Sequence, residues 1–138
     1  MELSDASRVL AGILLLSLVT VETGGVLMFR IITRRQQVTP QQETFFRAGH
    51  AHAGVFLVLG LVVQILVDAT TLTGLAEWVA RAFVPLAAIL LPGGFFLSMA
   101  GPGRAEPNRV VVLVPIGAVV LAIGLVTLGV GLLVADPS

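Results

Sequence analysis

The sequence contains no cysteine, no tyrosine and no lysine among its 138 residues. Without cysteine the chain forms no disulfide, no thiolate metal site, no iron–sulfur ligation and no covalent haem attachment through Cys-x-x-Cys-His. Charged residues are also scarce: they make up 12% of the chain, against about 25% in soluble domains. The eight arginines and eight acidic residues leave no net charge, and no basic stripe is present to bind a nucleic acid backbone. We therefore expect no nucleic-acid partner.

Apolar residues dominate instead, with 57% hydrophobic residues and a mean hydropathy of +1.02. A helix needs about 20 mostly apolar residues to cross a bilayer, and four segments have this length: 9–32, 45–67, 75–100 and 110–135. The N-terminus lacks the basic region and cleavage site of a signal peptide, so the first segment should stay in the membrane. The connections are short, which predicts an all-α fold: one antiparallel four-helix bundle in a single transmembrane domain over 1–138, with both termini on the same side.

The arginines are unevenly distributed along the chain. Six lie in or beside the first and third connections, and two lie toward the opposite side of the membrane. Arginine-rich loops usually stay in the cytoplasm. We therefore expect loops 33–44 and 101–109 to be cytoplasmic and both termini to be outside, in a plasma membrane of bacterial type. The six arginines are Arg30, Arg34, Arg35, Arg47, Arg104 and Arg109.

Glycine and proline positions predict how the segments pack. Gly117, Gly124 and Gly131 recur every seven residues in the fourth segment. Such small residues let membrane helices approach closely, either within the chain or, alternatively, between copies of it. Prolines inside the last two segments leave backbone carbonyls that a neighbouring group must satisfy. The prolines are Pro85, Pro92 and Pro115, and the candidate N-caps for the first, second and fourth helices are Ser4 or Asp5, Thr39 and Asn108.

The only two histidines, His50 and His52, lie near the start of the second segment. Ionisable groups at membrane depth are costly and therefore mark functional candidates. At about 100° per residue the two rings are separated by about 200° around a helix, so they cannot hold one ion together. If both are functional, each serves a different neighbour.

Glu22 lies near the middle of the first segment. A carboxyl group there must be protonated, paired or bound to a metal. Antiparallel packing of the first two segments brings it within reach of an imidazole, and we expect a contact with His50 foremost, inside the bundle. Three roles stay open for this cluster: fixing the helix register, binding a metal or haem, and moving protons or ions. Asp68 is expected in the membrane interface, at the end of the second segment.

The run Phe46-Arg47-Ala48-Gly49-His50-Ala51-His52-Ala53-Gly54-Val55-Phe56 resembles the second transmembrane helix of haem-copper oxidases and nitric oxide reductases. It also resembles an actinobacterial family of four-span membrane proteins with a His-Ala-His motif. In the oxidases an Arg precedes a haem-ligating His by a few residues, and Arg47 precedes His50 by three.

The resemblance implies a haem b or a transition-metal ion, with His50, His52 and Glu22 as candidate ligands and Arg47 as a partner for a haem propionate. It implies a role in electron transfer or as an oxidase-like accessory subunit. No further histidine is available as a second axial ligand. The resemblance therefore implies either a second histidine from across a subunit interface, in a homo-oligomer or a larger membrane complex, or Met or Glu as the sixth ligand.

Motifs for catalysis are missing from the sequence: no nucleophile elbow, phosphate-binding loop or His-Glu-x-x-His pattern is present. We therefore expect no catalysis by the isolated chain. Two alternatives use the same polar residues. The chain is then either a small proton-coupled transporter or channel subunit, or a membrane scaffold whose Glu/His cluster only fixes helix packing.

Overall fold

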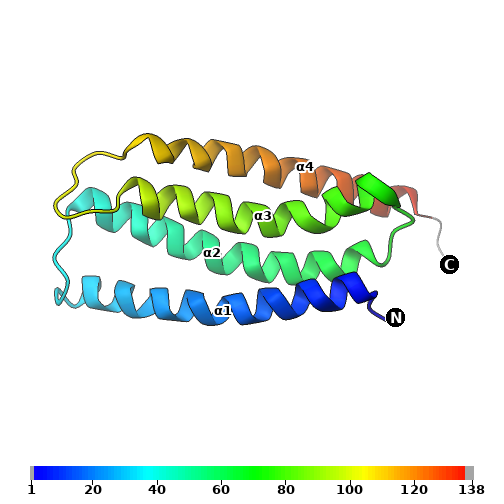
Figure 1. Ribbon diagram of the computed structural model, residues 1–138, viewed down its shortest axis with the longest axis horizontal. Coiled ribbons are helices and arrows are strands. Elements are labelled where there is room, and N and C mark those ends of the chain that lie inside the picture. The colour runs from blue at the N-terminus through cyan, green and yellow to red at the C-terminus, as the bar shows by residue number, and fades with distance from the viewer. Residues whose placement is uncertain (1, 136–138) are drawn as a thin grey trace.

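The computed structural model describes residues 2–135, and residues 1 and 136–138 lie outside the described part. Four long helices run antiparallel, and α1 begins at the same end of the bundle at which α4 ends (Figure 1). Each is long and apolar enough to cross a membrane, which confirms the predicted all-α four-helix bundle. The helices are α1 (Asp5–Ile32), α2 (Pro40–Val67), α3 (Gly74–Ser98) and α4 (Leu113–Val134), with a 3₁₀ helix η1 (Arg109–Val112) before α4.

Capping side chains set where the helices begin. The Ser4 hydroxyl accepts a hydrogen bond from the Ser7 N–H (3.2 Å), so α1 begins at Asp5. Thr39 and Gln42 form a reciprocal capping box, and α2 therefore begins at Pro40, a turn before the predicted span. The Asn108 side chain caps η1 through the Val110 N–H. The predicted caps Ser4 and Thr39 are confirmed. Asn108 caps η1 instead of α4, whose own N-cap residue Val112 makes no capping side-chain hydrogen bond.

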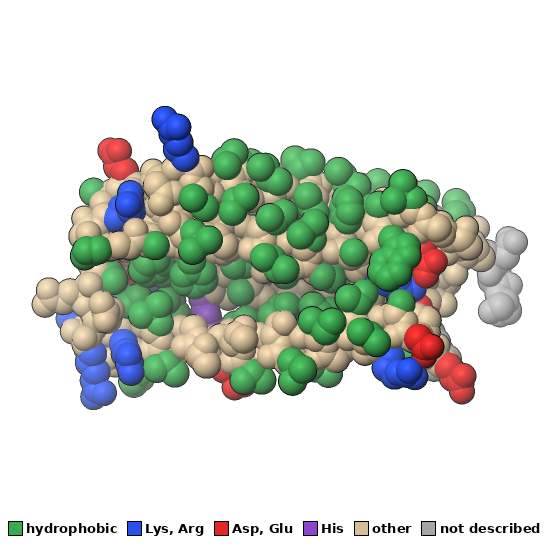
Figure 2. Space-filling view, in the orientation of Figure 1, with side chains coloured by type: hydrophobic (Ala, Val, Ile, Leu, Met, Phe, Trp, Pro, Cys, Tyr) green, Lys and Arg blue, Asp and Glu red, His purple; other side chains and the backbone are tan. Residues whose placement is uncertain are grey.

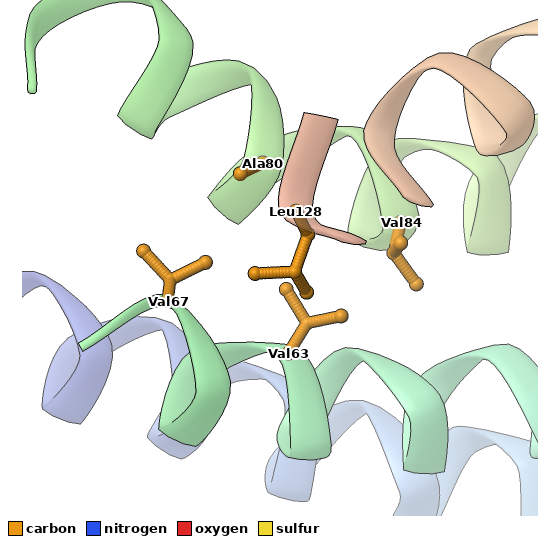
Figure 3. Packing of buried hydrophobic residues seen from close by; sticks show 5 residues of the cluster. All are labelled: Val63, Val67, Ala80, Val84 and Leu128. Atoms are coloured by element: carbon orange, nitrogen blue, oxygen red, sulfur yellow. The ribbon is translucent and has the colours of Figure 1, made fainter. Parts of the chain in front are cut away.

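Each helix packs mainly on the next one along the chain. Figure 3 shows the core between α2, α3 and α4, where Leu128 lies among the side chains of Val63, Val67, Ala80 and Val84. A second apolar cluster joins α1 to α2 and α3 through Leu14, Leu57 and Ala88. The helix α3 is therefore the most enclosed helix, while α1 leaves most of its surface exposed.

The three glycines of α4 that recur every seven residues lie against α3 and the turn before it. A Cβ atom on Gly117 would lie 2.8 Å from a Leu91 methyl carbon, and one on Gly124 would lie 2.8 Å from the Phe83 Cβ. Gly131 meets Leu72 in the same way. These separations are too short for a side chain, so the predicted close packing within the chain is confirmed.

The proline prediction is confirmed at Pro85. This residue has no N–H, so the carbonyl of Arg81, four residues earlier in α3, has no helical donor. The buried Gln64 amide of α2 donates to that carbonyl oxygen (3.0 Å). A neighbouring helix thus satisfies the group that the proline leaves open.

The outside of the bundle suits a lipid environment. Hydrophobic side chains cover the length of the helices, and most charged side chains lie at the two ends, with one acidic side chain part-way along the bundle (Figure 2). With four candidate spans, the chain is a multi-pass membrane protein.

Candidate functional site

The two histidine rings face different helices, as the helical spacing predicts. The His50 ring lies on the two glycines of α1: a Cβ on Gly24 would be 3.2 Å from His50 Nδ1, and one on Gly25 would be 3.7 Å from His50 Cε1. The His52 ring faces α3, with its centroid 5.3 Å from that of Phe95. In Figure 2 a histidine side chain is visible in a recess on the side of the bundle.

His52 is held by its own helix. Its Nδ1 lies 2.7 Å from the carbonyl oxygen of Ala48. A carbonyl oxygen accepts and cannot donate, so Nδ1 carries the proton and Nε2 of the neutral ring keeps its lone pair. The half-buried ring also has Phe56 at 5.4 Å, edge to face. His52 therefore presents a fixed acceptor nitrogen among aromatic rings.

Glu22 does not meet either histidine inside the bundle, which corrects our expectation. Its side chain is exposed, and no hydrogen bond or ion pair joins it to His50 or His52 within residues 2–135. The reason is the rotation of α1. Val21 faces α2 beside Gly54, and the next residue lies about 100° further around the helix. Glu22 thus lies at mid-span on the flank of α1.

Arg47 lies at the loop end of the bundle. Its guanidinium is exposed, lies 3.7 Å from the Glu43 carboxylate, and lines a cleft beside the α1–α2 connection. No group of three or more His, Asp or Glu side chains able to hold a metal ion occurs in the described part of the chain. Glu22, His50 and His52 are therefore three separate positions.

A buried polar cluster, which the sequence reasoning missed, lies at the opposite end of the bundle. Arg81 is 1% exposed. It donates to Asp68 Oδ1 (3.0 Å), to Glu77 Oε1 (2.8 Å) and to the Ser7 hydroxyl. Asp68 in turn accepts from the N–H and the hydroxyl of Ser4, both at 2.9 Å. The cluster joins the first turns of α1 and α3 to the end of α2.

Asp68 follows the last residue of α2, as predicted, and its side chain is paired with these groups. Burial alone raises the pKa of its carboxyl group, but hydrogen bonds from Ser4, Ser7 and Arg81 outweigh burial and lower the pKa from 3.8 to about 2. Two buried atoms nearby, Gln64 Oε1 and Arg81 Nε, have no partner within residues 2–135. The only sequence signal was the Glu77–Arg81 spacing of one helical turn, inside an otherwise apolar helix.

The residues of this chain can thus do two things at membrane depth: present an imidazole nitrogen from α2, and present a carboxyl group from the flank of α1. Compared with protein-family models, curated proteins and solved structures, the chain matches none.

Proposed function

We propose that this chain binds a haem b or a transition-metal ion within the membrane through the histidines of α2, with His52 as the principal ligand. The observation that supports this function is the hydrogen bond between His52 Nδ1 and the Ala48 carbonyl. Metal-ligating histidines generally donate their second ring N–H to a carbonyl or carboxylate, which fixes the ring and its tautomer. His52 has this setting, and its Nε2 is the atom that would hold the metal.

The surroundings of His52 also fit a bound haem or metal. The rings of Phe56 and Phe95 lie against the half-buried imidazole, and an apolar shell of this kind tunes the redox potential of a ligated metal. A bound haem would supply one-electron transfer, which is the chemistry of an electron-transfer or oxidase-like accessory subunit. The residues of the chain then supply a ligand, its orientation and an apolar environment.

We propose further that the functional unit is a homo-oligomer or part of a larger membrane complex. His50 faces α1 and His52 faces α3, so one chain offers a single imidazole to any one metal. A second axial histidine must come from another chain. The predicted ratio is one haem for two chains, and it is measured from haem absorbance and protein concentration after gel filtration with light scattering.

The test of the ligand uses the purified, detergent-solubilised protein, its absorption spectrum and its metal content. His52→Gln should abolish the haem Soret band or the bound metal. His50→Gln should retain at least half of the wild-type content of haem or metal. Loss in His50→Gln alone would move the ligand to His50, the position that the oxidase resemblance favours. A wild-type protein that carries no haem or stoichiometric metal, and takes up neither on reconstitution, would overturn the proposal.

Glu22 supports a second candidate function, the movement of protons or another ion. It is an exposed carboxyl group at mid-span with no partner in the described chain, and such groups mark ion pathways in membrane proteins. This function predicts a pH-dependent flux in proteoliposomes that Glu22→Gln abolishes. Flux that survives the substitution contradicts it. If neither ion flux nor cofactor binding is detected, the results support the scaffold function, in which the polar residues only fix helix packing.

For the orientation we propose that the connections at 33–44 and 101–109 face the cytoplasm and that both termini face outward. Six arginines at the loop end support it. Because the chain has no cysteine, a single introduced cysteine is the only thiol in it, and its labelling shows on which side of the membrane that residue lies. A membrane-impermeant maleimide added to whole cells should label Thr71→Cys and leave Gln37→Cys unlabelled. The reverse pattern would invert the topology.

A further inference from the structure

A cleft of about 660 Å³ opens at the loop end of the bundle, between the end of α1 and the start of α2. One part of its wall is apolar and formed by Ile31, Ile32 and Val38. The rest carries polar groups from two separate elements: Arg34 belongs to the connection, and Arg47 belongs to α2. The remaining lining residues are Gln36, Gln37, Pro40 and Glu43.

The end of the bundle that contains the cleft has an excess of positive charge. Six arginines and two glutamates lie there. At the other end both arginines have carboxylate partners, Arg8 with Asp5 (2.8 Å) and Arg81 within its buried cluster. At the loop end the only ion pair within residues 2–135 is the exposed one between Arg47 and Glu43, and exposed pairs of this kind are weak. Of the two arginines that line the cleft, Arg47 has only this weak pair. Arg34 has no carboxylate partner in the described chain.

The backbone at Arg34 gives an independent reason to look for a ligand. Its φ is +58°, in the left-handed region. The next two N–H groups, of Arg35 and Gln36, both donate to the Arg30 carbonyl (2.8 and 3.0 Å) and close the end of α1. Glycine or asparagine normally occupies the left-handed position of such a helix end. An arginine there is unfavourable for the fold, and residues kept in such conformations often serve a function.

We propose that this cleft binds the phosphate group of an anionic phospholipid. Arginine presents its donors as a planar fork that matches phosphate oxygens, and the amides of Gln36 and Gln37 are suitable donors for the polar remainder of a headgroup. The cleft lies directly beyond the last turn of α1, which places it at the headgroup level of a spanning bundle. The apolar wall at Ile31 and Ile32 continues into the hydrocarbon region, where acyl chains lie. This wall favours a lipid over a free phosphate.

In this proposal Arg47 binds a lipid phosphate instead of the haem propionate that the oxidase resemblance suggests. The proposal is independent of the histidine site, which lies further along α2. Its failure and the failure of the haem or metal proposal are therefore separate results, because one is read from bound lipid and the other from a spectrum.

The test measures phosphatidylglycerol binding to the full-length protein in a neutral detergent by native mass spectrometry, with phosphatidylcholine as the reference lipid. Each guanidinium near a headgroup is expected to contribute about fivefold in affinity. The Arg34→Gln, Arg47→Gln double variant should therefore bind phosphatidylglycerol about 25-fold more weakly. The matched control is Arg35→Gln, Arg109→Gln, which removes the same charge at the same end from residues that do not line the cleft. It should lose less than about threefold. Equal losses in the two variants would overturn the proposal.

A single substitution separates binding from folding. Arg34→Gly removes one guanidinium and relieves the left-handed backbone, so its melting temperature should rise while its phosphatidylglycerol affinity falls about fivefold. Unchanged affinity would overturn the role of Arg34. Inorganic phosphate at 10 mM, about the concentration of a free metabolite, should neither displace the lipid nor raise the melting temperature. If it does both, the cleft binds a free phosphate and the lipid assignment is wrong.

Discussion

At the scale of single residues, the Asp68 carboxylate shows how strongly an end cap of a membrane helix can be held. It follows the last residue of α2 and accepts hydrogen bonds from the backbone and side chain of Ser4 and from Arg81. All of these donors stabilise the ionised form, which is why its pKa falls to about 2 although burial acts in the opposite direction. The residue before the first turn of α1 is therefore held to the end of α2 by hydrogen bonds to an ionised carboxylate.

This attachment predicts a stability that depends on pH. Because the pKa of Asp68 is lower in the folded chain than its usual 3.8, its contribution is complete above that value and is lost as the pH falls toward 2. The melting temperature of the detergent-solubilised protein should therefore drop between pH 5 and pH 2.5. Asp68→Asn should lower the melting temperature at pH 7 and reduce the slope in this range. A slope equal to that of the wild type would contradict the role of Asp68 in this pH dependence.

Residue positions within the helices were predictable only in part. The separation of His50 and His52 follows from helical geometry alone, so the sequence was sufficient for it. The exposure of Glu22 depends on how α1 is rotated, and that rotation is decided by which of its residues pack against α2. The partners of Arg81 come from positions distant in the sequence, and no local pattern connects them to it.

At the scale of helices, adjacent glycines in α3 have opposite surroundings. A Cβ on Gly94 would lie 2.8 Å from Val114 Cγ2 and 2.9 Å from the Val114 backbone nitrogen. A Cβ on Gly93 would meet nothing within 4 Å. The start of α4 therefore approaches α3 closely over Gly94 and leaves Gly93 open.

The pair gives a matched prediction for the packing of α3 against α4. Gly94→Ala should lower the free energy of unfolding by about 1–3 kcal/mol, because the backbone of α4 must move. Gly93→Ala should raise it by up to about 1 kcal/mol, because alanine is the better helix former. Reversible unfolding in mixed micelles measures both. A loss of equal size in the two variants would mean that the glycines serve backbone flexibility and not close packing.

Sequence patterns predicted the helices well because hydropathy over about 20 residues is a strong signal. The ends of the helices were harder to predict from the sequence, since they depend on local hydrogen bonds. The capping box begins α2 at Pro40, a turn before its apolar run. The α3 helix stops at Ser98, two residues before the predicted limit, and Gly101 beyond it has a φ of +112°. Apolar length sets where a helix exists, and capping groups set where it stops.

At the scale of the whole molecule, α1 is the helix with the least cover, because it packs mainly on α2. Its attachment depends on two regions: the apolar cluster around Leu14, and the polar cluster of Arg81 at the end where α1 begins. The second region connects three helices through one side chain. Arg81 is therefore central to the assembly of the bundle.

Replacing Arg81 by methionine tests this role. Methionine has a similar shape but leaves Asp68 and Glu77 without their cation, and removal of one partner from a buried pair costs about 3–5 kcal/mol. The matched control is Arg8→Met, whose pair with Asp5 has exposed fractions of 71% and 89% and should matter by less than about 1 kcal/mol. Unfolding in mixed micelles gives both values, and protease cleavage near the start of α1 should increase in Arg81→Met alone. The triple variant Arg81→Met, Asp68→Asn, Glu77→Gln removes the unpaired charges and should recover part of the loss. Equal stability of the two single variants would show that apolar packing around Leu14 is sufficient to hold α1.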